Sequence, residues 1–182
     1  MYTKATVAKH PIHPMLIAFP VALYTATVVA LIVHAVTTDP FWYRLAFWSN
    51  LGGVVMAAVA AVPGFIDLVT LPSQTRARVT GLRHAVFNVL ALALFTISCV
   101  ILGRHWYGDQ ILRDAAPLVL GVIGLGSTLV AGALGWTMVQ THHVGIKPTE
   151  HHGLRMADEV DDLDELIVPP SGQPNAGYPL PH

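Results

Sequence analysis

Cysteine and charged residues are both scarce in this sequence of 182 residues. Its only cysteine, Cys99, excludes an intramolecular disulfide, a cysteine-based zinc site and a c-type haem attachment motif. Charged residues make up 12% of the chain and hydrophobic residues 53%, which is typical of a polytopic membrane protein and not of a soluble domain. The formal net charge of -1 provides no argument for nucleic-acid binding.

Several patterns typical of enzymes and targeting segments are also absent. The chain has no G-x-S-x-G elbow, no P-loop and no HExxH helix, so we do not expect a hydrolase or a transferase, while a redox module stays open. No cleavable signal peptide is apparent, because the first apolar stretch is too long for an h-region. We find no convincing internal repeat in the sequence.

Four apolar stretches are long enough to cross a bilayer, which takes about 20 mainly apolar residues per helix. They cover residues 14–36, 45–69, 82–103 and 115–139. Because the connections between them are short, the sequence predicts an all-α, antiparallel four-helix transmembrane bundle. Small residues at four-residue steps predict close packing of the second and fourth helices, at Gly53, Ala57, Ala61, Gly124, Thr128 and Gly132.

Prolines indicate where the helices begin and bend. A residue that precedes proline avoids helical backbone angles, whereas proline suits the first helical position, so we expect the first helix to begin at Pro14, with His13 at or near its cap. Pro20 and Pro63 lie inside the first and second spans. Each removes a backbone donor and is expected to kink its helix.

The transmembrane domain, residues 14–146, is expected to lie between two shorter regions. Residues 1–13 form an N-terminal segment, and residues 147–182 combine histidines, an acidic run and a proline- and glycine-rich end. This composition predicts a mostly disordered acidic tail, with one short amphipathic helix that could dock a partner as the alternative.

Positive charge predicts the orientation of the bundle. In a four-helix arrangement both termini share a side with the connection between the second and third helices. That side carries Lys4, Lys9, Arg76, Arg78, Arg83, Lys147 and Arg155, and the other carries Arg44, Arg104 and Arg113. Since cytoplasmic segments carry the excess of lysine and arginine, we expect both termini in the cytoplasm.

Ionisable residues lie at one end of each of the four spans. His10 and His13 precede the first span, Asp67 ends the second, His84 begins the third and His143 follows the fourth. Because chain direction alternates through the bundle, these ends share one membrane face. Ionisable groups at membrane depth are costly and usually mark function.

Neutral imidazole is the commonest metal ligand, so this cluster predicts a site for a b-type haem or a transition metal such as iron, copper or zinc, serving electron transfer. The candidate ligands are His10, His13, His84 and His143, and the candidate supporting groups are Asp67, Asn88 and Arg83. On the opposite face, His34 and His105 could hold a second site. The alternative is a non-catalytic membrane subunit or small transporter in which the His/Asp cluster is a proton relay or a structural clasp.

Four segments carry a family resemblance. The opening HPIHPMLIAFPVALY, the AVPGFIDL of the second span, the GLRHAVFNVLALALFTIS of the third and the closing GALGWTMVQTHHVGI resemble a bacterial family of four-helix membrane proteins of unknown function with a His-Pro-x-His-Pro opening. The resemblance covers about residues 8–146. The family's recurring polar positions correspond to His10, His13, Asp67, His84 and His143.

The resemblance also implies a setting for the protein. Some relatives look like fusions with Rieske iron–sulfur or cytochrome c modules, which implies a redox partner protein or a larger membrane complex. It further implies a multi-pass protein of the bacterial cytoplasmic (inner) membrane, in contact with the lipid bilayer and open to homo-oligomer formation. The sequence does not name the metal, the partner or the oligomeric state.

A reporter fusion tests the predicted orientation. Alkaline phosphatase fused after His182 should be inactive, and a fluorescent reporter fused at the same residue should fold and fluoresce, because the carboxyl terminus is expected in the cytoplasm. The opposite pattern of activities would place the polar cluster on the outer face.

Overall fold

The computed structural model describes residues 6–7, 10–104, 106, 115–142 and 144. A minimal antiparallel pair of strands precedes the helices and places Val7 opposite His10. The elements are β1 (Thr6–Val7), β2 (His10–Pro11), α1 (Ile12–Leu16), α2 (Ala18–Thr37), α3 (Pro40–Thr70), α4 (Arg76–Arg104) and α5 (Ala116–Gln140). The predicted acidic tail, residues 147–182, lies outside the described residues.

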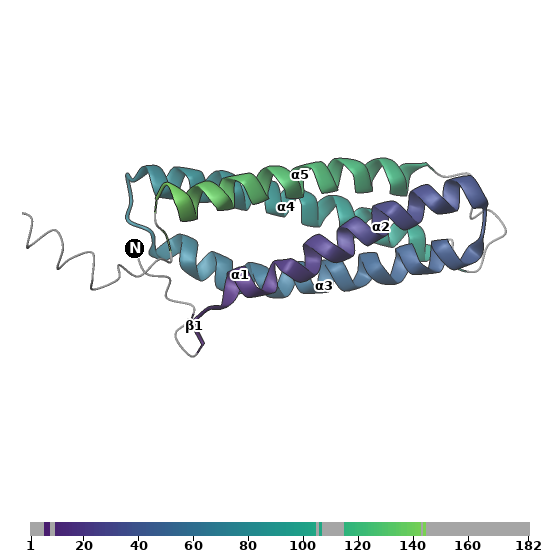
Figure 1. The fold of residues 1–182 in the computed structure, drawn as a ribbon, viewed down its shortest axis with the longest axis horizontal. Coiled ribbons are helices and arrows are strands. Elements are labelled where there is room, and N and C mark those ends of the chain that lie inside the picture. The colour runs from purple at the N-terminus through teal and green to yellow at the C-terminus, as the bar shows by residue number, and fades with distance from the viewer. Residues whose placement is uncertain (1–5, 8–9, 105, 107–114, 143, 145–182) are drawn as a thin grey trace, which may run out of the picture. The chain divides into compact units, whose positions relative to one another are not determined.

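The bundle contains four helical spans long and apolar enough to cross a membrane, which confirms the predicted all-α transmembrane architecture. α1 and α2 together form the first span, and α3, α4 and α5 form the other three (Figure 1). The outward surface is strongly apolar, as contact with lipid requires. Large side chains exposed on it include Val29, Ile32, Val55, Val59, Val89, Ile97, Val122 and Leu129.

Helices α2 and α3 are joined more tightly than expected, by Thr38 and Asp39 alone. Thr38 has a left-handed backbone with φ 58°, which ends α2. The Asp39 carboxylate then caps α3 by accepting a hydrogen bond from the Phe41 amide at 2.8 Å, and Pro40 occupies the first turn. An Asp-Pro pair is a strong helix start, so the helix begins at Pro40 and not at the predicted residue 45.

The first helix begins and is interrupted at residues other than those that the prolines predicted. The first helix begins at Ile12, so His13 lies within its first turn and not at its cap. The predicted break at Pro20 appears three residues earlier, at Ile17, because the proline ring crowds the preceding turn. α3 runs without interruption through Pro63.

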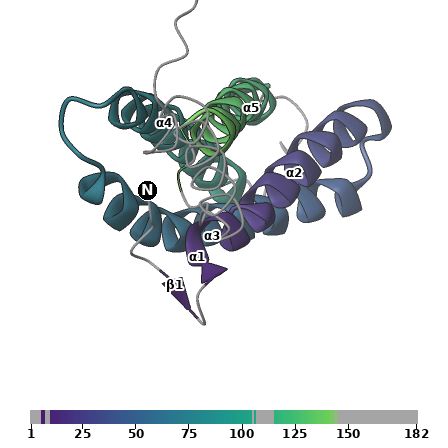
Figure 2. The ribbon, with the colours of Figure 1, turned by 60° about the vertical axis from the view of Figure 1, so that its left-hand side comes forward.

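Two helical hairpins, α2–α3 and α4–α5, pack against each other along the bundle (Figure 2). At its centre the Tyr24 and Phe95 rings stack, with centroids 3.7 Å apart and planes 2° from parallel. Each ring also lies against a glycine of the next helix: a methyl added to Gly53 would come within 2.7 Å of the Tyr24 ring, and one added to Gly124 within 2.8 Å of the Phe95 ring. Glycine is therefore needed at both positions.

The small-residue prediction is correct in part. Gly53, Gly124 and Thr128 are buried, as expected. Ala61 is exposed, and nothing lies within 4 Å of a methyl added to Gly132. The buried small residues instead recur at seven-residue steps, at Ala46, Gly53 and Ala60 in α3 and at Pro117, Gly124 and Ala131 in α5. This is the spacing of a helix that faces its neighbour along one stripe.

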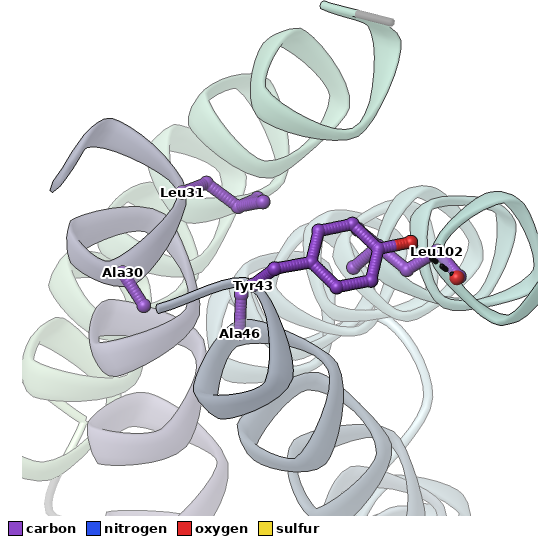
Figure 3. Packing of buried hydrophobic residues seen from close by; sticks show 5 residues of the cluster. All are labelled: Ala30, Leu31, Tyr43, Ala46 and Leu102. Carbon is purple, nitrogen blue, oxygen red and sulfur yellow. Dashed lines mark hydrogen bonds between the residues drawn. The ribbon is translucent and has the colours of Figure 1, made fainter. Parts of the chain in front are cut away.

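Aromatic packing and a hydrogen bond close the end of the bundle where α2 joins α3. The buried Tyr43 ring packs with Ala30, Leu31, Ala46 and Leu102 (Figure 3). Its hydroxyl donates a hydrogen bond to the Leu102 carbonyl, which ties α3 to α4.

A chain of polar groups crosses the bundle interior between three helices. The Asn50 amide of α3 lies 3.2 Å from the Ser98 hydroxyl of α4, which donates to the Pro117 carbonyl of α5 at 3.2 Å. All three residues are buried. Hydrogen bonds between helices offset the cost of placing polar groups at membrane depth.

Replacement of Gly124 tests the central contact. Gly124→Ala should destabilise the bundle by about 1–3 kcal/mol, because the new methyl overlaps the Phe95 ring. Gly126→Ala, two residues along the same helix, is the matched control, since nothing lies within 4 Å of its added methyl. Equal unfolding curves for the two variants in detergent would contradict the described packing.

Candidate functional site

Two of the predicted site histidines, His13 and His84, lie against each other at the end of the bundle where residues 71–75 join α3 to α4. Their ring centroids are 6.1 Å apart and their planes are 87° from parallel. Both side chains are half-buried. The chain therefore brings together the starts of its first and third spans, as chain direction predicted.

His13 is held by the neighbouring helix α3. Its Nδ1 donates a hydrogen bond to the Ala60 carbonyl at 2.8 Å. The ring also lies over Gly64, one turn further along α3, where an added methyl would come within 2.8 Å of Cε1 and Nδ1. A side chain at position 64 would overlap the His13 ring, so glycine is needed there for the imidazole to pack against α3.

His84 is held by α5 in the same manner. Its Nδ1 donates to the Ala131 carbonyl at 2.8 Å, and a methyl added to Gly135 would lie 3.3 Å from its Cε1. Asn88, one turn along α4, donates from Nδ2 to Nε2 of His84 at 3.0 Å and to the His84 carbonyl at 2.9 Å. The Ala131 carbonyl therefore orients the ring, and Asn88 covers its other nitrogen.

These contacts fix the tautomers of both rings. A carbonyl oxygen can only accept, so Nδ1 of each histidine carries a proton, and in the neutral imidazole Nε2 then carries the lone pair. A histidine that binds a metal in a protein nearly always donates its other ring N–H to a carbonyl or carboxylate. The Nδ1 atoms of His13 and His84 donate in this way, which leaves Nε2 as the nitrogen that a metal would meet.

The remaining predicted residues lie in different places. Asp67 is half-buried in the last turn of α3, three residues beyond Gly64. His10 belongs to β2, just before α1, and its side chain is outside the described part of the chain, as is His143. The structure therefore joins two of the four predicted ligands and leaves the other two unplaced.

Arg83 lines a separate, open pocket of about 380 Å³. Its other lining residues are Gln74, Thr75, Arg76, Val79, Thr80 and His142. Nε2 of His142 lies 3.4 Å from the Thr80 hydroxyl, which links the end of α5 to the start of α4. His142, and not its neighbour His143, is the histidine of this region that the structure describes.

At the opposite end of the bundle, His34 is buried with 6% of its surface exposed. Its Nδ1 donates to the Asp39 carbonyl at 2.9 Å, and its ring meets Tyr43 edge-on at 5.5 Å. Among the described residues, Nε2 has no hydrogen-bond partner. The proposed companion, His105, lies outside the described residues.

The sequence interpretation missed the backbone groups that hold the histidines. Ala60 and Ala131 contribute only carbonyl oxygens, and Gly64 and Gly135 contribute only the absence of a side chain. One signal was present: each histidine is followed 47 residues later by its bonded alanine and then by a glycine one turn on. Within the described part of the chain, no group of three or more histidine, cysteine, aspartate or glutamate residues could hold a metal ion.

Comparison with known proteins places the chain in one family. Residues 9–148 match the family described as Predicted membrane protein (DUF2231), and the chain belongs to it. The expectation of a membrane protein family is thereby confirmed, together with lipid contact and a multi-pass arrangement. No curated protein and no solved structure matched the chain.

Nitrogen NMR tests the tautomers. In metal-free protein, long-range ¹H–¹⁵N spectra should show His13 and His84 protonated on Nδ1, because both nitrogens donate to carbonyl oxygens. Loss of one signal in His13→Gln and of the other in His84→Gln assigns them. A predominant Nε2–H form at either residue would contradict the described hydrogen bonds.

Proposed function

We propose that this protein is a small membrane redox module that binds one transition-metal centre, a bare ion or the iron of a b-type haem, through Nε2 of His13 and His84. The observation that carries the proposal is the arrangement of the two rings. Each imidazole has Nδ1 bonded to a helix carbonyl, and the two rings are in contact. In the neutral rings this arrangement leaves one lone pair, on Nε2, in each of two neighbouring imidazoles.

The spacing of the rings fits a shared metal. A metal ion lies about 2 Å from a ligating imidazole nitrogen, so two rings bound to one ion have centroids about 5–6 Å apart. The observed separation is 6.1 Å. The Asn88 amide would have to turn away from Nε2 of His84 for the ligand to bind. His10, His143 and Asp67 are the residues we propose to complete or tune the site.

The chain's own contribution is to hold the ligands in a dry, apolar bundle. When bound, such a centre supplies reversible one-electron chemistry, whose potential depends on ligand hydrogen bonds and burial. The carbonyls of Ala60 and Ala131 would raise the basicity of both imidazoles and lock their directions. Electron transfer to a partner protein at the membrane surface is the activity we propose, and the termini are proposed to face the cytoplasm.

A structural clasp is the second candidate function, and one contact favours it. Nε2 of His84 already accepts a hydrogen bond from Asn88, so both nitrogens of the His84 ring have partners without a metal. In this case the two histidines act by joining helices, His13 from α1 to α3 and His84 from α4 to α5.

Metal analysis and visible spectra distinguish the two candidates. Protein expressed with iron, copper, zinc and haem supplied should contain a stoichiometric metal centre. His13→Ala and His84→Ala should each lower that content at least 10-fold and remove the stabilisation that the ligand provides, because each takes away a ligand atom. The melting temperature of each variant, measured with and without the bound centre, reports this loss.

His142→Ala serves as the control, since His142 lies in the pocket beside Thr80 and not at the ring pair. Its metal content should equal that of the wild type. Wild-type protein that binds zinc alone, which has no redox chemistry, would defeat the redox proposal. Wild-type protein without any stoichiometric centre would defeat it as well and leave the clasp in its place.

A further inference from the structure

We infer that the bundle is a duplicated helical hairpin, and that the His13–His84 pair is a two-fold site in which equivalent imidazoles from the two copies hold one metal centre between them. The first copy contains α1, α2 and α3, and the second contains α4 and α5. The duplication rests on contacts alone. Only the identity of the ligand rests on the proposed function.

The hydrogen bonds that hold the two histidines are the same in both copies, and a methyl added to the glycine under each ring would come within 2.8 Å at Gly64 and 3.3 Å at Gly135. His13 bonds the Ala60 carbonyl and His84 bonds the Ala131 carbonyl, each 47 residues further along the chain and each at 2.8 Å. One turn beyond each alanine, a glycine lies under the ring. The second set follows the first at a constant offset of 71 residues, the separation of His13 and His84.

The central aromatic contacts repeat with the same offset. Tyr24 lies over Gly53, and Phe95, 71 residues after Tyr24, lies over Gly124, 71 residues after Gly53. The two approaches are nearly equal, 2.7 and 2.8 Å from an added methyl to the ring. Side-chain contacts in the middle of the bundle and at one end therefore recur with the same offset along the chain.

The sequence carries the repeat once the offset is known. Residues 23–34 read LYTATVVALIVH, and residues 94–105 read LFTISCVILGRH, with leucine, threonine, valine, leucine and histidine recurring in register. The inferred duplication replaces our expectation of no internal repeat. The recurring pairs include the exposed Thr25/Thr96 and Val29/Val100 as well as the buried Leu31/Leu102, and the residues that differ between them hide the relationship. The offset also relates His34 to His105 in the sequence.

Counterparts from the two copies touch each other, which locates the axis. His13 contacts His84, and Tyr24 stacks on Phe95. In a two-fold arrangement, a residue can meet its own counterpart only at the axis. Because each copy contains two spans, both copies cross the membrane in the same direction, and the axis runs along the bundle between the hairpins seen in Figure 2.

A ligand at the ring pair would lie on this axis and meet the same nitrogen from each side. Such a centre would take one imidazole nitrogen from each copy, from His13 and from His84. One contact breaks the symmetry. Asn88, which covers Nε2 of His84, corresponds to Ile17 beside His13.

Exchange of this pair tests the duplication without any ligand. Ile17 follows His13 by one helical turn, with its amide 3.2 Å from the His13 carbonyl, so Asn at this position should reach the His13 ring as Asn88 reaches His84. In metal-free Ile17→Asn/Asn88→Ile protein, the ¹⁵N signal of His13 Nε2 should show a new hydrogen bond and that of His84 Nε2 should lose one. If the double variant folds but its ¹⁵N signals show no such exchange of hydrogen bonds, the two copies are not equivalent. If the double variant does not fold, Asn88→Ile alone should show the loss at His84, and Ile17→Asn alone should show the gain at His13.

Matched ligand changes test the two-fold site. His13→Met and His84→Met should give the same change in haem or copper spectrum and affinities equal within about three-fold, because each leaves one imidazole and one thioether. Binding that needs only one of the two histidines would overturn the two-fold site and the proposed pair of ligands, while the exchange experiment would still decide the duplication. Absence of any bound centre in the wild type would defeat the proposed function, whereas the exchange experiment would still decide the duplication.

Discussion

Close contact between a large side chain of one helix and a glycine or alanine of the next is the interaction on which the rest of this structure depends. In a bilayer the helices have no hydrophobic reason to associate, because lipid tails are as apolar as leucine. Tyr24 on Gly53 and Phe95 on Gly124 replace that driving force with packing and hold each hairpin together. The stacked rings then join one hairpin to the other.

The histidines extend this packing to one end of the bundle and add hydrogen bonds to it. His13 and His84 lie over glycines as the aromatic rings do, but their Nδ1 atoms also reach the carbonyls of Ala60 and Ala131. Each imidazole packs in a helix–helix interface through its ring and Nδ1, and its Nε2 remains as the nitrogen that we propose binds a metal. The proposed metal site therefore requires little beyond what the packing already provides.

The two-fold relation explains how a four-helix protein positions a pair of histidines against each other. A histidine that lies on the interior face of a hairpin near the axis meets its own counterpart when two hairpins pair. Departures from the symmetry then show where the copies have diverged. Asn88 opposite Ile17 is one, and the buried Asn50, which corresponds to Gly121, is another.

The sequence by itself determined the number of spans, their alternating direction and the face on which the histidines gather, because length and hydropathy decide how a chain crosses a bilayer. It did not determine helix ends such as Pro40, where a local cap prevails over hydropathy. Only the tertiary structure decided which histidines meet, because their partners are carbonyls and glycines whose importance lies in a close approach between helices. The repeat became visible for the same reason: equivalent contacts between helices recur at a constant offset although many of the residues around them differ.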